Sequence, residues 1–424
     1  MEAGATPRRP VFIYDKNKVG GGEHLFLRRA EAARRLGLDP VIVTFPGAMD
    51  AAYRRAARLV HVPKPLLAKC GLTPALGERL ADQLAATIGD RPSSIEATGM
   101  PALYLASLLS ARWPGSDHSF YAIGPRPVPR HRPPRLADLA GRPRDFLKAL
   151  AGRACYGELA DLAARGRFLS VNLPCVRDAE TQLGVPLPGA VLHPVAFAPP
   201  TLRHQPDAAR PYLLSVSRLD GGMKAYVEGL VRLLPELRAT RPELRLILVG
   251  DGPARGALEQ LAAGAPAGAV EFRGSLPNEA LGPLYAGCEV FVGMGTAAIE
   301  AAMHGAPVVI AAESEPRGLS PGCFGEPGLV GFGENVPGQV VRPFRELLGP
   351  LLRDPAQARA IAERGRLLAE NLHGSEGLER RLRAFLSTPP SRGATLPCPW
   401  PEAHRLALTL AAGYAWRRLV VEVT

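Results

Sequence analysis

The sequence predicts an α/β protein with two domains, each built on a doubly wound parallel sheet. Short apolar runs that fit strands alternate with helix-like segments through most of the 424 residues, which is typical of parallel sheets covered by helices. The alternation stops between Phe197 and Arg210, where APPTLRHQPDAAR contains three prolines and no apolar periodicity, and it then begins again. The length also suits two or three domains, since one domain takes about 100–200 residues.

The first half begins with a strand at Val11–Asp15, a glycine-rich turn at Gly20–Gly22 and an amphipathic helix from Glu23 to Leu36. The other strands expected here are Pro40–Phe45, Leu59–Val62, Ser94–Thr98, Ser119–Ile123, Phe168–Asn172 and Val191–Val195. The other helices expected here are Pro101–Arg112, Phe146–Ala163 and Val176–Leu183.

The second half repeats the alternation. Its expected strands are Tyr212–Ser217, Leu244–Val249, Val270–Arg273, Glu289–Val292 and Pro307–Ala311. Its expected helices are Ala225–Ala239, Ala254–Ala263, Asn278–Ala286, Thr296–His304, Pro343–Leu352 and Ala356–Glu370, and a last helix is expected at Glu402–Leu419. The predicted domains are therefore 1–197, a linker at 198–211, 212–386, and a proline-rich segment with a terminal helix at 387–424.

The positive charge is concentrated in the first half. The chain has 51 basic and 40 acidic residues and a formal net charge of +11. Residues 1–200 contain 27 basic and 17 acidic side chains, whereas residues 201–424 contain 24 and 23. The stretch from Arg126 to Arg153 alone has eight basic and two acidic residues. Nucleic acid, an anionic membrane and a phosphorylated substrate are all compatible with such a field.

The basic stretch has two interpretations, a solvated surface loop or a site for an anionic acceptor. It follows an expected strand, and its acceptor-side candidates are Arg126, Arg130 and Arg132. Nucleic acid is disfavoured, because the stretch has one aromatic residue, Phe146, where a single-strand platform would interleave several. The expected acceptor is thus a glycan, a lipid-linked group or a small molecule.

Cysteines and targeting features indicate a cytoplasmic protein. The six cysteines form no Cys-x-x-Cys pair, so we expect no zinc module and reduced thiols. Residues 1–10 lack the apolar core of a signal peptide, and no apolar run approaches the 18–20 or so residues of a membrane span. The helix at Glu402–Leu419 could pack on the first domain or lie on a membrane surface, where its tryptophan and arginines would suit the interface.

Two cations follow the first strand of the second half. Arg218 comes directly after the strand, and Lys224 opens the next helix. A guanidinium group offers a bidentate fork and an ammonium group a compact charge, so the pair could hold a diphosphate. An ordinary solvated pair is the alternative interpretation.

Two further strand ends have small residues that would let a ligand approach the backbone. Gly250 follows one strand, within Gly-Asp-Gly-Pro, although such a turn is often only a turn. The next strand end, Gly293–Thr296, leads into a helix, whose free N–H groups and positive end suit a phosphate. Glu300 lies one turn further on, where its carboxylate could accept hydrogen bonds from ribose hydroxyls.

These strand ends, in this order, resemble the nucleotide-sugar glycosyltransferases of the two-Rossmann-domain (GT-B) type, specifically the retaining family four. The resemblance covers about 212–370 and rests on YLLSVSRL…K, LILVGDGPARGALEQLA, VEFRGSLPNEALGPLYAGCEVFVGMGTAAIEAAMHGAPVVIA and LLRDPAQARAIAERG. The first half matches less closely, through VFIYDKNKVGGGEHLFLRRAEAARRLGLDPVIVTF and FLSVNLPCVRDAETQLGVP.

The resemblance implies that Arg218 and Lys224 are the catalytic residues, because they bind the diphosphate that departs from the donor. The residues it assigns to the rest of the donor site are Gly21, Gly22, Gly250, Arg273, Leu276, Gly295, Thr296 and Glu300. Glu300 would bind the ribose, and Gly295 and Thr296 would offer backbone N–H groups. No Asp-x-Asp motif is present, so we expect neither a metal nor a cofactor, only the nucleoside-diphosphate sugar as substrate.

Two departures from the family pattern stand out. Val292 occupies the position of the first of two glutamates, the one that normally contacts the transferred sugar. The histidine usual after a central strand of the first domain is missing, since that stretch is Tyr121–Gly124. The expected function is a retaining glycosyltransferase acting between the two domains. The alternatives are a glycosyltransferase-like binding or scaffold subunit that has lost turnover, and a sugar-nucleotide epimerase.

Overall fold

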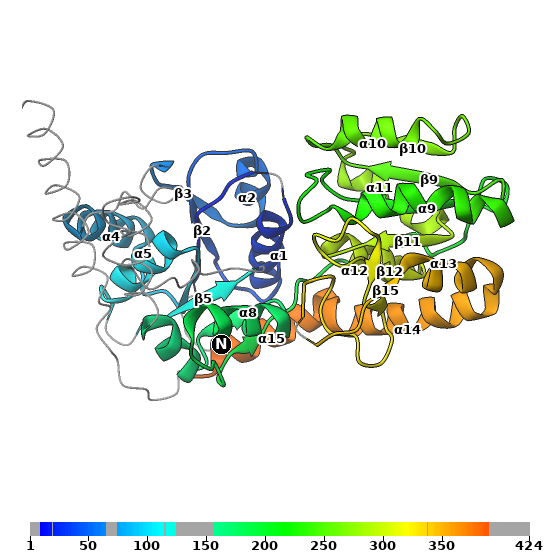
Figure 1. Ribbon diagram of the computed structural model, residues 1–424. Helices are drawn as coiled ribbons and strands as arrows, with labels where there is room; N and C mark the ends of the chain where they lie inside the picture. The colour runs from blue at the N-terminus through cyan, green and yellow to red at the C-terminus, as the bar shows by residue number, and fades with distance from the viewer. Residues whose placement is uncertain are drawn as a thin grey trace, which may run out of the picture. The chain divides into compact units, whose positions relative to one another are not determined.

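The computed structural model describes residues 9–18, 20–64, 74–113, 116–123, 157–336 and 338–389 (Figure 1). Contacts divide the chain into two compact units. The first unit combines Met1–Pro194 with Leu378–Thr424, and the second is Val195–Gly377. Each unit is a Rossmann-like α/β structure, which confirms the predicted fold class.

The first unit has a parallel sheet of seven strands in the order β3-β2-β1-β4-β5-β6-β7. Its strands are β1 (Pro10–Tyr14), β2 (Val41–Thr44), β3 (Arg58–His61), β4 (Ser94–Thr98), β5 (His118–Ala122), β6 (Phe168–Ser170) and β7 (Val191–Leu192). The central strands PVFIY and VIVT are buried at every position. Strands that are covered on both faces have continuous runs of apolar residues, and these runs made the strands predictable from the sequence.

Helices cover this sheet. They are α1 (Gly21–Arg35), α2 (Asp50–Ala56), α4 (Pro74–Ile88), α5 (Met100–Ser110) and α8 (Leu173–Leu183). Helix α8 shows its boundary signals clearly: the Asn172 side chain accepts a hydrogen bond from the Cys175 N–H at 3.0 Å, and the helix ends at Gly184 with φ +70°. Of the helix expected at Phe146–Ala163, the structure describes residues 157–163, and these are helical.

The second unit has a six-stranded sheet in the order β10-β9-β8-β11-β12-β14, parallel except for the pair β12–β14. Its strands are β8 (Tyr212–Val216), β9 (Arg245–Val249), β10 (Val270–Phe272), β11 (Val290–Gly293), β12 (Val308–Ile310) and β14 (Gly322–Cys323), with a separate pair β13 (Leu319–Ser320) and β15 (Arg342–Pro343). Its helices are α9 (Tyr226–Thr240), α10 (Arg255–Ala262), the 3₁₀ turn η1 (Asn278–Ala280), α11 (Leu281–Gly287), α12 (Thr296–His304), α13 (Phe344–Arg353) and α14 (Pro355–His373).

Both sheets have the same strand arrangement at their centre. In each unit the first strand lies between the second and the fourth, so the order of the strands reverses between β1 and β4 and between β8 and β11. Ligands of open α/β sheets bind outside the carboxyl ends of the strands at such a switch point. The loops after β1, β4, β8 and β11 are therefore the places where the topology favours a site.

The proline-rich segment 198–211 packs on the second unit, although the sequence predicted a linker. The backbone N–H of His204 donates to the His304 carbonyl at 2.8 Å, and those of Gln205 and Asp207 donate to the carbonyls of Ala286 and Gly287 at 2.8 and 2.9 Å. These carbonyls belong to the last turns of α12 and α11, where a helix leaves its C=O groups without partners. The segment thus caps two helices, which its composition did not reveal.

The helix α15 (Ser375–Ser387) was not predicted, and from Leu378 onward it groups with the first unit. Leu378, Leu382 and Phe385 are buried, with the helical spacing of one apolar face. The guanidinium group of Arg167 lies 4.8 Å from the centre of the Phe385 ring. The sequence predicts one domain over 212–386, whereas the second unit ends at Gly377. The helix predicted at Glu402–Leu419 lies outside the described residues.

No helix in the described ranges has the length and the apolar character that crossing a bilayer requires.

A buried cluster of charged and aromatic groups joins four elements of the first unit. Arg29 of α1 is 1% exposed and donates to Glu96 of β4 and, at 3.0 Å, to Nδ1 of His193. Its guanidinium group also lies 4.8 Å from the centre of the Tyr121 ring of β5. Burial lowers the pKa of His193 to about 2, so its ring stays neutral and accepts this bond. Phe385 of α15 contacts the same ring edge-on at 5.5 Å.

The cluster predicts a large effect of removing one charge. Arg29→Met should lower the free energy of unfolding by about 3–5 kcal/mol, because it leaves the Glu96 carboxylate buried without its partner. The double variant Arg29→Met, Glu96→Leu should regain most of this loss. Urea unfolding followed by circular dichroism measures both effects, and an unchanged midpoint for Arg29→Met would contradict the structural role of the pair.

Candidate functional site

The loop after β8 is held in place by Gly250 and by backbone hydrogen bonds to the loop after β9. The N–H of Ser217 donates to the Val249 carbonyl at 2.9 Å, and that of Leu219 donates to the Asp251 carbonyl at 3.0 Å. Gly250 has φ +129°, and a Cβ there would lie 1.8 Å from the Ser217 carbonyl oxygen. Only glycine allows this approach. The sequence-predicted Gly250 therefore positions the segment that leads into Arg218.

The Arg218 side chain is available to a ligand. It is 78% exposed, and among the residues that the structure describes its one ion pair is a 3.3 Å contact with Asp220. The other carboxylate oxygen of Asp220 accepts the N–H groups of Gly222 and Lys224, both at 3.2 Å, and so shapes the loop. A pair this exposed contributes at most about 1 kcal/mol, so an incoming anion can replace Asp220 at little cost.

Lys224 is a partly buried cation without a direct partner. Within the described ranges its ammonium group makes neither an ion pair nor a hydrogen bond, although Asp220, Glu313 and Glu334 are close enough to act on its charge. Burial lowers the pKa of Lys224 to about 8. A desolvated, unpaired ammonium group beside an exposed guanidinium group is typical of an anion site rather than of a stabilising salt bridge.

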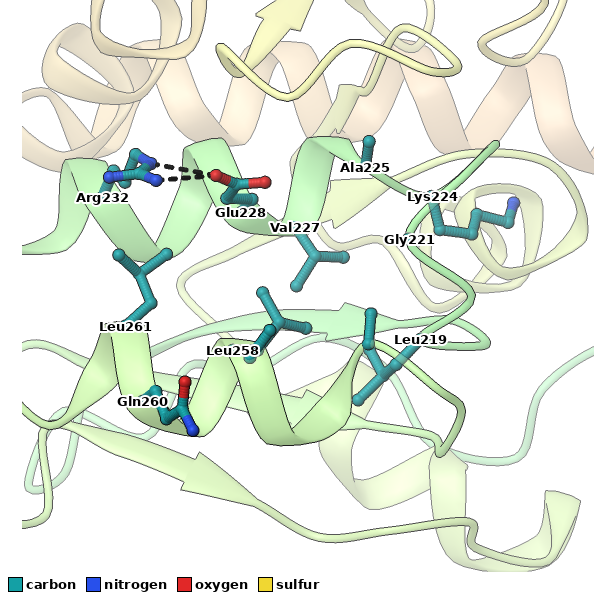
Figure 2. Close-up of a pocket in the computed structure, with 12 residues that line it drawn as sticks. Leu219, Gly221, Lys224, Ala225, Val227, Glu228, Arg232, Leu258, Gln260 and Leu261 are labelled. Atoms are coloured by element: carbon teal, nitrogen blue, oxygen red, sulfur yellow. Dashed lines mark hydrogen bonds and ion pairs between the residues drawn. The ribbon is translucent and has the colours of Figure 1, made fainter.

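The same loop also borders an apolar pocket of about 400 Å³ between α9 and α10. Leu219, Val227, Leu258 and Leu261 line it, and Figure 2 shows the Lys224 side chain extending away from the last two. Glu228 and Arg232 of α9 pair with each other at its edge, with an N–O distance of 2.7 Å. Lys224 also lines this pocket, at the end opposite to Leu261 (Figure 2).

The loop after β11 provides a helix N-terminus at the switch point. Gly295 has φ +67° and is the residue before α12, and no side chain caps this helix. The resemblance predicts that both Gly295 and Thr296 offer N–H groups to a ligand. The Gly295 N–H instead donates to the Phe332 carbonyl at 2.8 Å, so the donors that face outward begin with Thr296.

Glu300 lies one turn into α12 and is partly exposed. One of its oxygens accepts a hydrogen bond from the Tyr285 hydroxyl at 3.3 Å. Burial, together with the Glu300 charge, raises the pKa of Tyr285 well above its usual value, so the tyrosine remains a donor. This bond orients the carboxylate on the same helix turn as Thr296.

The residues expected around a base lie beyond β9 and β10. The Gly250 N–H donates to the Gly274 carbonyl at 2.7 Å, which brings the two loops together. The Arg273 side chain pairs with Glu271 at 2.7 Å, and Leu276 is partly buried. Arg273 is therefore held by its neighbour, and the two glycines are partly buried.

Gly21 and Gly22 belong to the first unit, where they form the first turn of α1. A Cβ on Gly22 would lie 2.4 Å from the Tyr14 hydroxyl and 2.8 Å from Ile123 Cδ1. The glycine thus permits close packing of α1 on β1 and β5. Arg126, Arg130 and Arg132 lie outside the described residues, as does the rest of 124–156.

The sequence did not reveal Asp15, at the carboxyl end of β1 and at the switch point of the first sheet. Its Oδ1 is buried without a hydrogen-bond partner in the described ranges, and burial raises its pKa to about 6. Gly99 at the end of β4 has φ +90°, and a Cβ there would lie 2.2 Å from Asp15 Oδ2. The conformation of one strand end thus makes room for the carboxyl group of the other.

Residues 210–332 match the family described as Glycosyl transferases group 1. The chain is 26% identical over 336 residues to the sulfoquinovosyl transferase SQD2 of Arabidopsis thaliana, covering 73% of this chain and 61% of that protein. It is 28% identical over 177 residues to the GDP-mannose-dependent monoacylated alpha-(1-6)-phosphatidylinositol monomannoside mannosyltransferase of Corynebacterium glutamicum, covering 38% and 44%. The chain therefore spans less than two thirds of the length of these relatives.

A solved structure with a similar fold is Anabaena Alr3699/HepE in complex with UDP. It superposes with a TM-score of 0.60 at 17% identity, and the match covers 89% of this chain and 99% of that chain. At this level of identity the likeness establishes the fold.

The close packing of the β8 and β9 loops predicts that Gly250 cannot be replaced. Gly250→Ala should lower the free energy of unfolding of the second unit by more than about 2 kcal/mol, since a left-handed φ alone costs about 1–3 kcal/mol. Gly264→Ala is the matched control, because its Cβ would meet no atom within 4 Å. Equal unfolding midpoints for the two variants would contradict the role given to Gly250.

Proposed function

The chain has the GT-B fold and contains a glycosyl transferases group 1 domain at residues 210–332, and on this basis we propose that it is an enzyme that transfers a sugar. The donor would be a nucleoside-diphosphate sugar, and the acceptor a hydroxyl group, with retention of the anomeric configuration. The observation that supports this most is the pair of uncommitted cations, Arg218 and Lys224, in the loop after β8.

The two cations suit the charge that develops during transfer. When the bond between the sugar and the diphosphate breaks, negative charge collects on the departing phosphate oxygens. Donors that are already in position stabilise this charge most, because they need no reorganisation. Arg218 would offer its fork, Lys224 its ammonium group, and the N-terminus of α12 its free N–H groups. In this proposal these groups balance the leaving-group charge without a metal.

The donor's nucleoside would lie along the loops after β9 and β10. Glu300 is one helix turn from Thr296, so a ribose one bond beyond the phosphates would meet its carboxylate. The glycines at 250 and 274 would let the base approach the backbone. Support comes from the solved relative in complex with UDP, whose fold the chain shares.

The acceptor would be bound by the first unit and would be anionic or linked to a lipid. Residues 1–200 hold almost all of the excess positive charge, and positive fields attract anionic partners. The Corynebacterium glutamicum relative is named for a phosphatidylinositol mannoside substrate, which is an acceptor of this kind. The enzyme would then work in the cytoplasm, with peripheral contact to the membrane face.

The proposal predicts binding and turnover of one class of nucleotide sugar. We expect one member of a panel of UDP-, GDP-, ADP- and dTDP-sugars to raise the unfolding temperature and to be cleaved slowly to its nucleoside diphosphate. Arg218→Ala should reduce this cleavage about 10²-fold or more. Arg232→Ala, which removes an exposed arginine of α9 paired with Glu228, is the control and should leave the rate unchanged.

Two results would overturn this function. Cleavage by Arg218→Ala at the rate of the unaltered protein would remove the catalytic role of the cation pair. Binding of a nucleotide sugar without any release of nucleoside diphosphate would identify a binding subunit, an alternative that the buried Val292 in place of a glutamate favours.

Lys224 predicts a pH dependence of nucleotide affinity. Its lowered pKa of about 8 means that the ammonium group is charged below that pH and neutral above it. Affinity for the nucleoside diphosphate should therefore fall as the pH rises from 7 to 9, by up to about tenfold per unit above the pKa. Lys224→Arg keeps its charge in this range and should show no such fall. A pH-independent affinity of the unaltered protein, measured by calorimetry, would contradict the role of Lys224.

A further inference from the structure

Three neighbouring strand ends converge at the carboxyl edge of the second sheet. In the order β8-β11-β12, the first strand leads to Lys224 and the second to the N-terminus of α12. The third strand leads to Glu313, which is 9% exposed. Because the strands are parallel and adjacent, these loops lie at one edge of the sheet.

Hydrogen bonds fix the backbone around Glu313. Its N–H donates to the Gly333 carbonyl at 2.8 Å, within the same loop whose Phe332 carbonyl accepts the Gly295 N–H. The N–H of Ser314 donates to the Met223 carbonyl at 3.0 Å. The backbone of Glu313 is thus bonded to the loop that contains Phe332 and Gly333, and that of the next residue, Ser314, is bonded to the residue before Lys224.

Ser314 shows that this placement is strained. Its φ is +58°, and it is the one residue other than glycine with positive φ in the described part of the chain. Side chains with a Cβ seldom adopt this conformation, and such residues persist where the surrounding contacts enforce them, often at ligand sites. Here the strain directs the chain from Glu313 back to the loop containing Lys224.

The carboxylate and the ammonium group are close but not joined. The charge of Glu313 acts on Lys224, yet the two form no ion pair or hydrogen bond in the described ranges. One oxygen of Glu313 accepts the Asn335 N–H at 3.4 Å, and the other has no hydrogen-bond partner in the described part of the chain. A carboxylate with an uncommitted oxygen beside an unpaired cation can receive a ligand that has both a phosphate and hydroxyl groups.

The neighbouring strand end has no carboxylate of its own. Val292 is 0% exposed and belongs to the apolar core of the second unit, as does Met294 at 7%. Besides Glu300, the acidic side chains whose charges act on Lys224 from the loops after β12 are Glu313 and Glu334. Of these two, Glu313 is the one that comes directly after β12.

We propose that Glu313 selects the transferred sugar: its carboxylate accepts hydrogen bonds from sugar hydroxyls while Arg218 and Lys224 hold the adjoining diphosphate. The inference rests on the proposed function. An ionised acceptor strengthens its bonds to hydroxyl groups and repels a second negative charge. The site therefore favours a neutral sugar with free hydroxyl groups over an acidic sugar such as a uronate.

Calorimetry with the full chain tests this selection. The screen above identifies the base that the protein binds. The nucleoside diphosphate with this base is then compared with its glucose and glucuronate conjugates. If the base is uracil, the three ligands are UDP, UDP-glucose and UDP-glucuronate. We expect the unaltered protein to bind the glucose conjugate at least about tenfold more tightly than the glucuronate conjugate. Glu313→Gln keeps the shape and should weaken the glucose conjugate about tenfold, leave the free nucleotide within twofold, and remove the discrimination against glucuronate. Glu315→Gln, two residues away and paired with Arg317, should change none of these affinities.

The outcomes separate the two proposals. If no nucleotide binds to the unaltered protein, the proposed function fails, and this inference fails with it. If nucleotides bind but Glu313→Gln keeps both preferences, the inference alone is overturned. Affinity for the free nucleotide reports the fold of the variant. If Glu313→Gln also loses affinity for the free nucleotide, the test is the preference of the unaltered protein for the glucose conjugate. Equal affinities of the unaltered protein for the glucose and glucuronate conjugates would overturn the inference.

Discussion

The second unit depends on the contact between Gly250 and the Ser217 carbonyl oxygen. A side chain at Gly250 would fall within 1.8 Å of that oxygen, so the loops after β8 and β9 can meet only because one residue has no Cβ. From this contact follow the backbone bonds of Ser217 and Leu219 and the direction of the loop toward Arg218 and Lys224. The position of both cations is therefore set mainly by this packing and by the backbone N–H groups that Asp220 accepts.

Because backbone contacts hold the loop, the side chains of Arg218 and Lys224 are available to bind a ligand. Elsewhere in the second unit arginines pair with acids on their own helix, as Arg366 does with Glu363 and Glu370 and Arg255 with Glu259. Such exposed pairs contribute little stability and satisfy the cation. Within the described residues Arg218 has only a 3.3 Å contact to Asp220, and the Lys224 ammonium group has no ion pair. Because glycines and backbone hydrogen bonds fold this loop, its cations need no strong ion pair within the protein and remain free to bind a substrate.

The first unit uses charge in the opposite way. Arg29 and Glu96 are completely buried and joined to each other, and aromatic rings and a neutral histidine surround them. Because His193 follows β7 and Phe385 belongs to α15, the cluster links the last strand of the sheet to the helix that follows the second unit in the sequence. A buried pair like this specifies which elements come together, whereas the cations after β8 specify what binds.

The sequence by itself determined the order of strands and helices, the two α/β units and most of the cation and glycine positions, since buried parallel strands are apolar runs and loops at their ends contain glycine. It did not determine the caps made by segment 198–211, the return of α15, or the neighbours of Lys224. Nor did it show that the Gly295 N–H donates to the Phe332 carbonyl, that Glu313 acts on the charge of Lys224, or that Asp15 lies against Gly99. Only tertiary structure decided these features, because hydrogen-bond partners and the charges that face each other depend on which strands lie side by side.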